Sequence, residues 1–188
     1  MTRSAALLIA IALVPTTAYA GIQDDIAVRI RRDGETFAVT VELTVDATPE
    51  QVFAVLTDYD HMAKFVSNVV ESRIVRRDGG KIVIEQKSRL VFGPLHFDFT
   101  NTRVVEPVPF GEIRSWVTEG DMQGSSFTTR LIPRGTRTLI DNRGSFYADR
   151  WIPPMIGNMV LESETRKQFQ EFRAEILRRK GVAATSDK

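Results

Sequence analysis

The side chains with the clearest capacity for chemistry lie together in the stretch Asp58-Tyr59-Asp60-His61. A carboxylate beside an imidazole can transfer protons as a general acid or base, and a tyrosine hydroxyl can polarise a carbonyl group. Aspartates are also common at helix ends, because their side chains hydrogen-bond nearby backbone groups. Here Asp60 can cap a following helix, and Tyr59 can cover the core while its hydroxyl meets water. We therefore interpret the stretch as a hinge between two short helices.

The two histidines of the chain, His61 and His96, fall in different predicted elements. Neither is accompanied by a second ligand pattern, so both are interpreted as surface residues. The chain has no cysteine, which excludes disulfides, thiolate metal sites and a cysteine nucleophile. The sequence therefore predicts no metal site and no cofactor.

The first 20 residues have the pattern of a secretory signal peptide. Arg3 gives a positive start, residues 5–14 are apolar, and Ala18-Tyr19-Ala20 places small residues at the two positions read by signal peptidase. Ten apolar residues are too few for a membrane-spanning helix, which needs about 20. We expect a protein of the periplasm or a secreted protein, with a signal peptide at 1–20, one domain at 21–180 and a disordered tail at 181–188.

The net charge of the chain indicates which classes of binding partner are disfavoured. Removal of the first 20 of 188 residues takes away one basic and no acidic residue, so that 24 basic and 24 acidic residues cancel. A neutral chain is a poor match for nucleic acid or an anionic membrane as its main partner. We expect no nucleic acid and no transmembrane segment after signal cleavage, while transient membrane contact stays open.

Alternating apolar residues and turn signals predict a mostly antiparallel sheet. Asp33-Gly34 is the turn of a first hairpin. The stretch Thr48-Pro49-Glu50-Gln51 begins a helix, with Thr48 and Gln51 placed for a capping box. A second short helix is predicted at 61–66. Further strands are predicted at 68–77, 81–91, 96–105, 112–119, 125–132 and 136–147.

From residue 154 to 180 the apolar residues recur at steps of three and four, which predicts one amphipathic helix of roughly 38 Å. Gly181 is expected to end it. The order of elements predicts an α+β fold, in which a curved antiparallel sheet packs its concave face against the long helix. A straight helix on a curved sheet leaves an apolar gap between them.

Several stretches carry a resemblance to a known family. They are VDATPEQVF from Val45, LTDYD from Leu56, KFV from Lys64, Gly120-Asp121-Met122, and Arg166 with Phe172-Arg173. Over residues 37–180 the chain resembles the START-like (SRPBCC) superfamily, in its polyketide cyclase/dehydrase and coenzyme-Q-binding branch. The resemblance implies a helix-grip fold around a hydrophobic cavity. Members bind lipids, quinones, hormones or polyketides, and a minority catalyse cyclisation or dehydration. The family has no shared catalytic motif, so no catalytic residue is carried over.

Strand alternation predicts which side chains line such a cavity. Several polar residues fall on otherwise apolar inward faces, and they either pair with backbone or neighbouring strands or bind the polar head of a ligand. Inward aromatic residues either line the cavity or fill it, and two methionines belong to the apolar stripe of the long helix. The predicted ligand-binding residues are Gln86, Ser88, Phe97, Phe99, Asn101, Arg103, Ser115, Phe127, Thr129, Asn142, Phe146, Met155 and Met159.

Three functions are compatible with these features. The favoured one is an exported, non-enzymatic binder or carrier of a hydrophobic small molecule, such as a lipid, an isoprenoid quinone or a polyketide-like compound. The second is a cyclase or dehydratase for a polyketide-like substrate, with Arg103, Tyr59 or His96 acting on carbonyls. The third is a protein adaptor that uses an open sheet edge or the basic helix end Arg178-Arg179-Lys180, although cations are expected at a helix C-terminus in any case.

Overall fold

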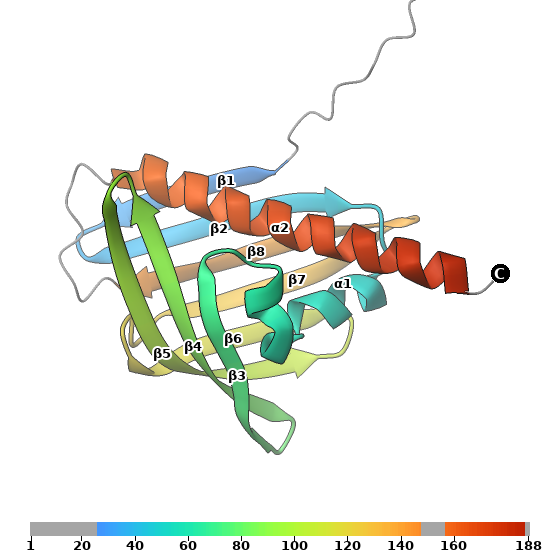
Figure 1. Ribbon diagram of the computed structural model, residues 1–188, viewed down its shortest axis with the longest axis horizontal. Helices are drawn as coiled ribbons and strands as arrows, with labels where there is room; N and C mark the ends of the chain where they lie inside the picture. Colours follow the sequence, from blue (N-terminus) through green and yellow to red (C-terminus); the bar gives the residue numbers. More distant parts are fainter. Residues whose placement is uncertain (1–25, 148–156, 187–188) are drawn as a thin grey trace, which may run out of the picture.

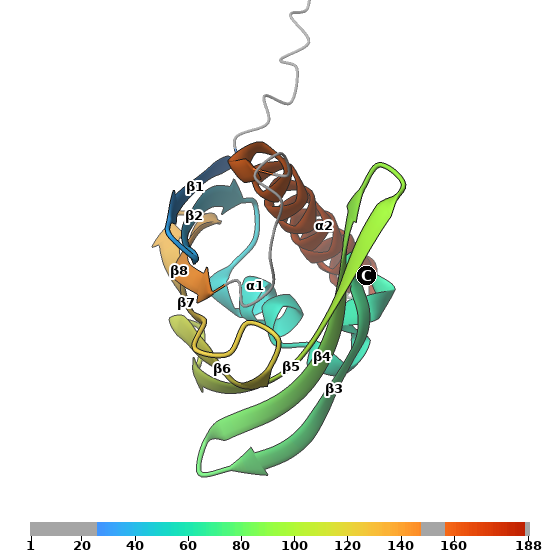
Figure 2. The ribbon, with the colours of Figure 1, turned by 90° about the vertical axis from the view of Figure 1, so that its left-hand side faces the viewer.

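The computed structural model of the chain describes residues 26–147 and 157–186. They form an eight-stranded antiparallel sheet in the order β1-β2-β8-β7-β6-β5-β4-β3. The sheet curves around one long helix, α2, which lies across its concave face (Figures 1 and 2). The elements in chain order are β1 (Ala27–Asp33), β2 (Thr36–Val45), α1 (Pro49–Leu56), the 3-10 helix η1 (Tyr59–Lys64), β3 (Val69–Asp78), β4 (Lys81–Phe92), β5 (Leu95–Val108), β6 (Glu112–Gly120), β7 (Ser126–Arg134), β8 (Arg137–Tyr147) and α2 (Gly157–Ser186).

The core lies between the concave face of the sheet and the helices. Val41 of β2, Ile84 of β4 and Ile140 of β8 are completely buried, as is Ile176 of α2. These strand residues all fall on predicted inward faces, because neighbouring strands pair in a register that keeps the faces aligned. The α+β helix-grip architecture is thereby confirmed.

The start of α1 follows the sequence prediction. Thr48 Oγ1 accepts a hydrogen bond from the Gln51 amide at 3.4 Å, and Gln51 Oε1 accepts one from the Thr48 amide at 3.0 Å. The second helix differs from the prediction, since it is a 3-10 helix that begins at Tyr59. Asp60 does not cap it. Its Oδ1 instead accepts a hydrogen bond from the Ile74 amide of β3 at 2.7 Å, because a free edge-strand N–H lies within its reach.

Both edges of the sheet are covered by side chains. At the β1 edge, the Ile30 amide donates to Glu162 of α2 at 3.2 Å, and Arg166 of α2 donates to the Ile26 carbonyl. At the β3 edge, Asp60 accepts the hydrogen bond of the Ile74 amide. Such contacts occupy backbone groups that another strand could otherwise pair with.

The second half of α2 is tied to the α1–η1 region. Arg179 Nη2 lies 2.7 Å from Asp58 Oδ2, and Lys180 Nζ lies 3.0 Å from Asp46 Oδ2. Glu171 accepts a hydrogen bond from the Ser67 amide at 2.9 Å. The basic helix end is therefore engaged within the molecule, which weakens the adaptor hypothesis.

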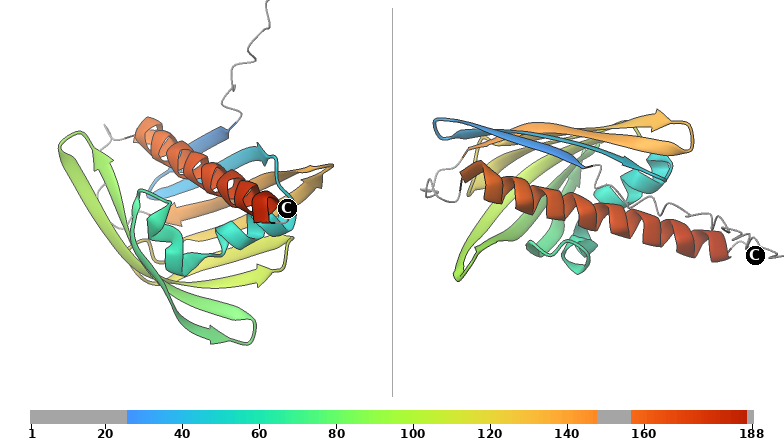
Figure 3. Two further views of the ribbon diagram at one scale, coloured as in Figure 1. Left: turned by 45° about the vertical axis from the view of Figure 1, so that its right-hand side comes forward. Right: turned by 90° about the horizontal axis from the view of Figure 1, so that it is seen from above.

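The predicted end of this helix at Gly181 is wrong. The helix continues through Gly181 to Ser186 and runs past the edge of the sheet (Figure 3), so most of the expected disordered tail is helical. Glycine inside a helix costs only about 1 kcal/mol, and the Thr185 hydroxyl bonds to the Val182 carbonyl at 2.8 Å in this last turn. The predicted signal peptide at 1–20, the predicted helix start at 154–156 and residues 187–188 lie outside the described residues.

Candidate functional site

A cavity of about 310 Å³ lies between the concave face of the sheet and α2. Strands β4 to β8 supply one wall, α2 supplies the opposite wall, and α1 and η1 close the side between them. The cavity reaches the surface beside Arg89 of β4, which is exposed and lines it. This is the gap that the sequence predicts between a curved sheet and a straight helix.

Most of the predicted ligand-binding residues line this cavity, since each lies on the inward face of its strand. They are Gln86, Ser88, Phe99, Asn101, Arg103, Ser115, Phe127, Thr129, Asn142 and Phe146. Whether they bind a ligand stays a prediction.

Three predicted residues are placed differently. Phe97 is half-buried but does not line the cavity. Met159 is 80% exposed, so its assignment to the inward stripe of the helix is wrong. The inward stripe follows Leu161, Thr165 and Gln168 at steps of four and three residues, and Met159 falls outside it. Met155 lies outside the described residues.

The sequence reasoning missed the contribution of η1 and of polar residues on α2. Tyr59 and Met62 line the cavity from η1, and Thr165 and Gln168 line it from α2. Tyr59 and Met62 lie three residues apart and share one face of η1, but a helix of six residues is too short for this spacing to stand out in the sequence. The two α2 residues had a usable signal, because they share one face with Leu161 and Phe172 at helical spacing.

Asp58 and His61 make contacts within the fold, as the hinge interpretation of the first stretch predicts. Asp58 Oδ1 lies 2.7 Å from His61 Nδ1, and its other oxygen binds Arg179. Burial raises the pKa of Asp58, but the hydrogen bonds from Arg179 and His61 outweigh burial and leave the pKa below its usual value. None of these three side chains lines the cavity.

Tyr59 departs from that interpretation. Its side chain is buried and lines the cavity, a role that the hinge interpretation does not include. Burial raises the pKa of Tyr59 to about 12, while the nearby charge of Arg103 acts in the opposite direction. At neutral pH the phenol is therefore protonated and can donate a hydrogen bond into the cavity.

The polar cavity residues differ in how their bonding capacity is used. The Asn142 amide donates to Thr129 Oγ1 at 2.7 Å, so these two side chains satisfy each other across β7 and β8. Arg103 makes only a long contact within the described residues, from its Nε to Asn101 Oδ1 at 3.4 Å. Burial lowers the pKa of the Arg103 guanidinium, and Tyr59 partly opposes this. Arg103 is thus the cavity residue with the most unused donors.

The sequence matches the family described as "Polyketide cyclase / dehydrase and lipid transport" over residues 36–179, which covers most of the chain. The chain belongs to this family. The match confirms the resemblance to the START-like superfamily and its polyketide cyclase/dehydrase branch. No curated protein is similar enough in sequence to count as a match.

Solved structures of similar fold include proteins of different activities. The Zhui aromatase/cyclase from a Streptomyces species has 18% identity and a TM-score of 0.64, and the match covers 77% of this chain and 95% of that one. A START superfamily protein from Mycobacterium smegmatis has 11% identity and a TM-score of 0.63, over 75% and 97% of the two chains. A STAR-related lipid transfer protein from Xanthomonas axonopodis has 13% identity and a TM-score of 0.58, over 79% and 98%. At these identities the likeness establishes the fold alone.

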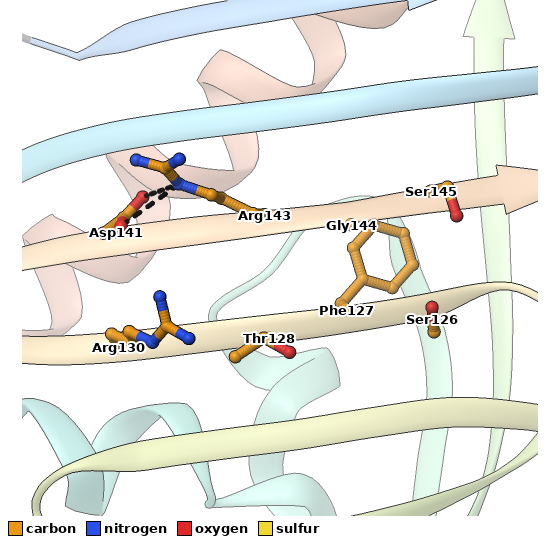
Figure 4. A pocket seen from close by; sticks show the side chains of 8 residues that line it. All are labelled: Ser126, Phe127, Thr128, Arg130, Asp141, Arg143, Gly144 and Ser145. Atoms are coloured by element: carbon orange, nitrogen blue, oxygen red, sulfur yellow. Dashed lines mark hydrogen bonds and ion pairs between the residues drawn. The ribbon is translucent and has the colours of Figure 1, made fainter.

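A second pocket, of about 390 Å³, lies on the outer face of β7 and β8 of this family member (Figure 4). Its charged side chains already have partners on the sheet. Arg143 Nε lies 2.9 and 3.2 Å from the two oxygens of Asp141, and Arg130 Nε lies 2.9 Å from Glu112. We interpret this groove as a solvated sheet face, and the inner cavity as the candidate site.

The described residues contain neither a cluster of metal ligands nor a membrane-spanning helix. Within residues 26–147 and 157–186, no three His, Asp or Glu side chains gather as metal ligands would. In the same part of the chain, no helix is long and apolar enough to cross a bilayer.

Proposed function

We propose that this family member is an exported binder or carrier of a hydrophobic small molecule, such as a lipid, an isoprenoid quinone or a polyketide-like compound. The observation that carries the proposal is the cavity between the sheet and α2, whose wall combines aromatic and aliphatic side chains with polar ones. Such a lining is typical of small-molecule sites. Each Å² of apolar ligand surface buried there contributes roughly 25 cal/mol, so binding requires no chemistry.

Export is supported by the pattern of the first 20 residues, in which a basic start precedes an apolar run and a small-residue cleavage site. An apolar compound that moves through an aqueous envelope compartment needs shielding from water. A periplasmic or secreted carrier with an internal pocket would supply that shielding.

Transient membrane contact is part of this proposal. The cavity reaches the surface beside Arg89, and Val91 on the same strand is 51% exposed. Met159, in the first turn of α2, is 80% exposed. Figures 1 and 2 show the β4–β5 turn and the start of α2 at the same end of the molecule. Apolar side chains at this end would let a guest pass from a bilayer without crossing water.

The test is native mass spectrometry of the protein purified from the envelope of its own cells. We expect a lipophilic compound in a one-to-one complex, released by organic solvent. Ser115→Phe should abolish the complex, because Ser115 is half-buried on the cavity wall and a large ring would occupy the space. The matched control is Thr128→Phe on the outer face of β7, which should retain the compound. Repeatedly empty protein from the native envelope would refute the proposal.

The second candidate, a cyclase or dehydratase for a polyketide-like substrate, is favoured by one observation. Arg103 and the protonated Tyr59 both line the cavity and could polarise a carbonyl there. His96 is exposed and does not line the cavity, so it drops out of this hypothesis. Turnover of a polyketide-like substrate that persists in Arg103→Gln and Tyr59→Phe would remove the proposed chemistry.

A further inference from the structure

The cavity wall changes from apolar to polar along two neighbouring strands. Along β4 the lining residues run from Leu90, near the β4–β5 turn, through Ser88 to Gln86. Along β5 they run from Phe99 through Asn101 to Arg103. At about 3.3 Å per residue, Arg103 lies about 13 Å farther from the turn than Phe99. The opening beside Arg89 is therefore at the apolar end, and the polar end is inside.

The polar end contains a charge without a counterion. Within the described residues no carboxylate acts on the charge of Arg103, and its two terminal nitrogens make no hydrogen bond to protein. The side chain is half-buried, so its guanidinium is partly removed from water without a protein counterion. A planar guanidinium binds carboxylate and phosphate oxygens through two parallel hydrogen bonds. The missing partner of Arg103 is thus best supplied by an anionic oxygen group.

The other charged residues of the wall lie elsewhere. Arg89 is at the opening, and its Nε is paired with Asp98 Oδ1 at 2.6 Å. Glu164 belongs to the first part of α2, three residues after Leu161. Arg103 is therefore the charged side chain that projects into the cavity from the inner part of β5. A negatively charged head is attracted inward by Arg103 and repelled by Glu164.

We propose that the ligand is an amphiphile with an oxyanion head, bound with the head at Arg103 and the apolar tail toward the opening between β4 and α2. This inference rests on the proposed function and adds the ligand class and its orientation. The uncharged Tyr59 hydroxyl and the Asn101 amide complete the set of donors around the head.

The first test compares probes that differ only in their head. Isothermal titration of the full chain with decanoate and decan-1-ol should show decanoate binding about tenfold tighter or more, as expected for a charge-assisted hydrogen-bonded pair. Decyl phosphate and decyl sulfate show which oxyanion fits best.

Variants of Arg103 test which residue recognises the head. In Arg103→Gln the affinities for decanoate and decanol should become similar, while Arg103→Lys should retain part of the preference because it retains the charge. Arg130→Gln, which removes an arginine from the outer face, is the matched control and should leave both affinities unchanged. Thermal melting verifies that each variant folds.

The second test measures orientation. A fatty acid with a nitroxide at its tail end should broaden the NMR signals of the Leu90 and Leu161 amides more than those of Tyr59 and Arg103. A nitroxide next to the carboxylate should give the reverse pattern.

The outcomes separate the two proposals. Equal wild-type affinities for decanoate and decanol would overturn the oxyanion head, and a reversed broadening pattern would overturn the orientation, while the carrier function would stand in both cases. If none of the probes bound at all, the carrier function and this inference would fall together.

Discussion

Polar side chains in the cavity wall fall into two groups, according to whether the protein satisfies them. Asn142 and Thr129 bond to each other at 2.7 Å and give rigidity to the wall without offering much to a guest. Arg103 has terminal donors with no partner among the described residues. At the scale of single residues, the Asn142–Thr129 bond therefore contributes to stability, while the role proposed for Arg103 is recognition.

This division leads to a stability prediction for Thr129→Val. Valine has nearly the same shape but accepts no hydrogen bond, so the buried Asn142 amide loses its partner. We expect a loss of about 1–3 kcal/mol in the free energy of unfolding, measured by urea titration. Ser115→Ala, at a lining residue that makes no side-chain hydrogen bond within the described residues, should cost less than about 1 kcal/mol. Equal losses in the two variants would contradict the role given to the Asn142–Thr129 bond.

The inward positions of the strand residues could be predicted from sequence, because the side-chain period of a strand is two and apolar residues mark one face. The pairing of Asn142 with Thr129 could not, since it depends on the register between β7 and β8. For Tyr59 the sequence predicts only that its ring covers the core, and not that it lines the cavity, because a short polar stretch gives no periodic signal. The lining residues on the strands could thus be predicted from the sequence, and those on η1 could not.

At the scale of elements, the turn residues predict the bounds of the strands correctly and the end of α2 incorrectly. Gly and Asp at the turns locate each hairpin to within a few residues, because these positions need backbone conformations that few residues adopt. Glycine is typical of helix ends, yet α2 continues through Gly181. The contacts of Arg179 and Lys180 anchor the helix up to Gly181, and the Thr185 hydroxyl bonds to helix carbonyls in the last turn.

A prediction for Gly181→Ala follows from this. The glycine is helical, and a Cβ atom there would have no neighbour within 4 Å. We expect stabilisation by about 0.5–1 kcal/mol, visible as a higher melting temperature, because alanine loses less backbone entropy in a helix.

Gly144→Ala is the contrasting variant. A Cβ at Gly144 would lie 2.2 Å from the Ser126 carbonyl oxygen and 2.5 Å from Phe127 Cδ1, so the strand pair would have to shift. We expect it to lower the melting temperature. Stabilisation by both substitutions, or by neither, would show that the local surroundings do not decide the effect.

At the scale of the whole molecule, carboxylates connect distant segments around the second half of α2. Glu175 binds Arg178 and Arg179 at 2.7 Å, and Arg179 also binds Asp58, which lies 121 residues earlier in the chain. The hydrogen bond from Arg178 lowers the pKa of Glu175 to about 2, although burial acts in the opposite direction. The pKa of Asp58 is also lowered in the folded state.

Acid should therefore weaken the fold. A carboxyl group whose pKa is lower in the folded than in the unfolded chain contributes stability above its unfolded pKa, and this contribution is lost as the pH falls. For Glu175 the loss should extend from about pH 4.5 to about pH 2. Urea midpoints measured from pH 6 to pH 2.5 should fall, and Glu175→Gln should flatten the fall. Glu119→Gln, at an exposed residue of β6, controls for the loss of one negative charge. A slope unchanged by Glu175→Gln would argue against this network.

The tethers of α2 also determine how a guest can leave. Glu162 and Arg166 hold the helix to β1, and Glu171 and Arg179 hold it to the region around η1. The arm formed by β4 and β5 on the other side of the cavity turns at Gly93, whose φ of 57° suits glycine. For the proposed carrier, we expect the residence time of a guest to follow how often this arm bends outward, so that stiffening its turn should slow dissociation while leaving the wall of the pocket unaltered.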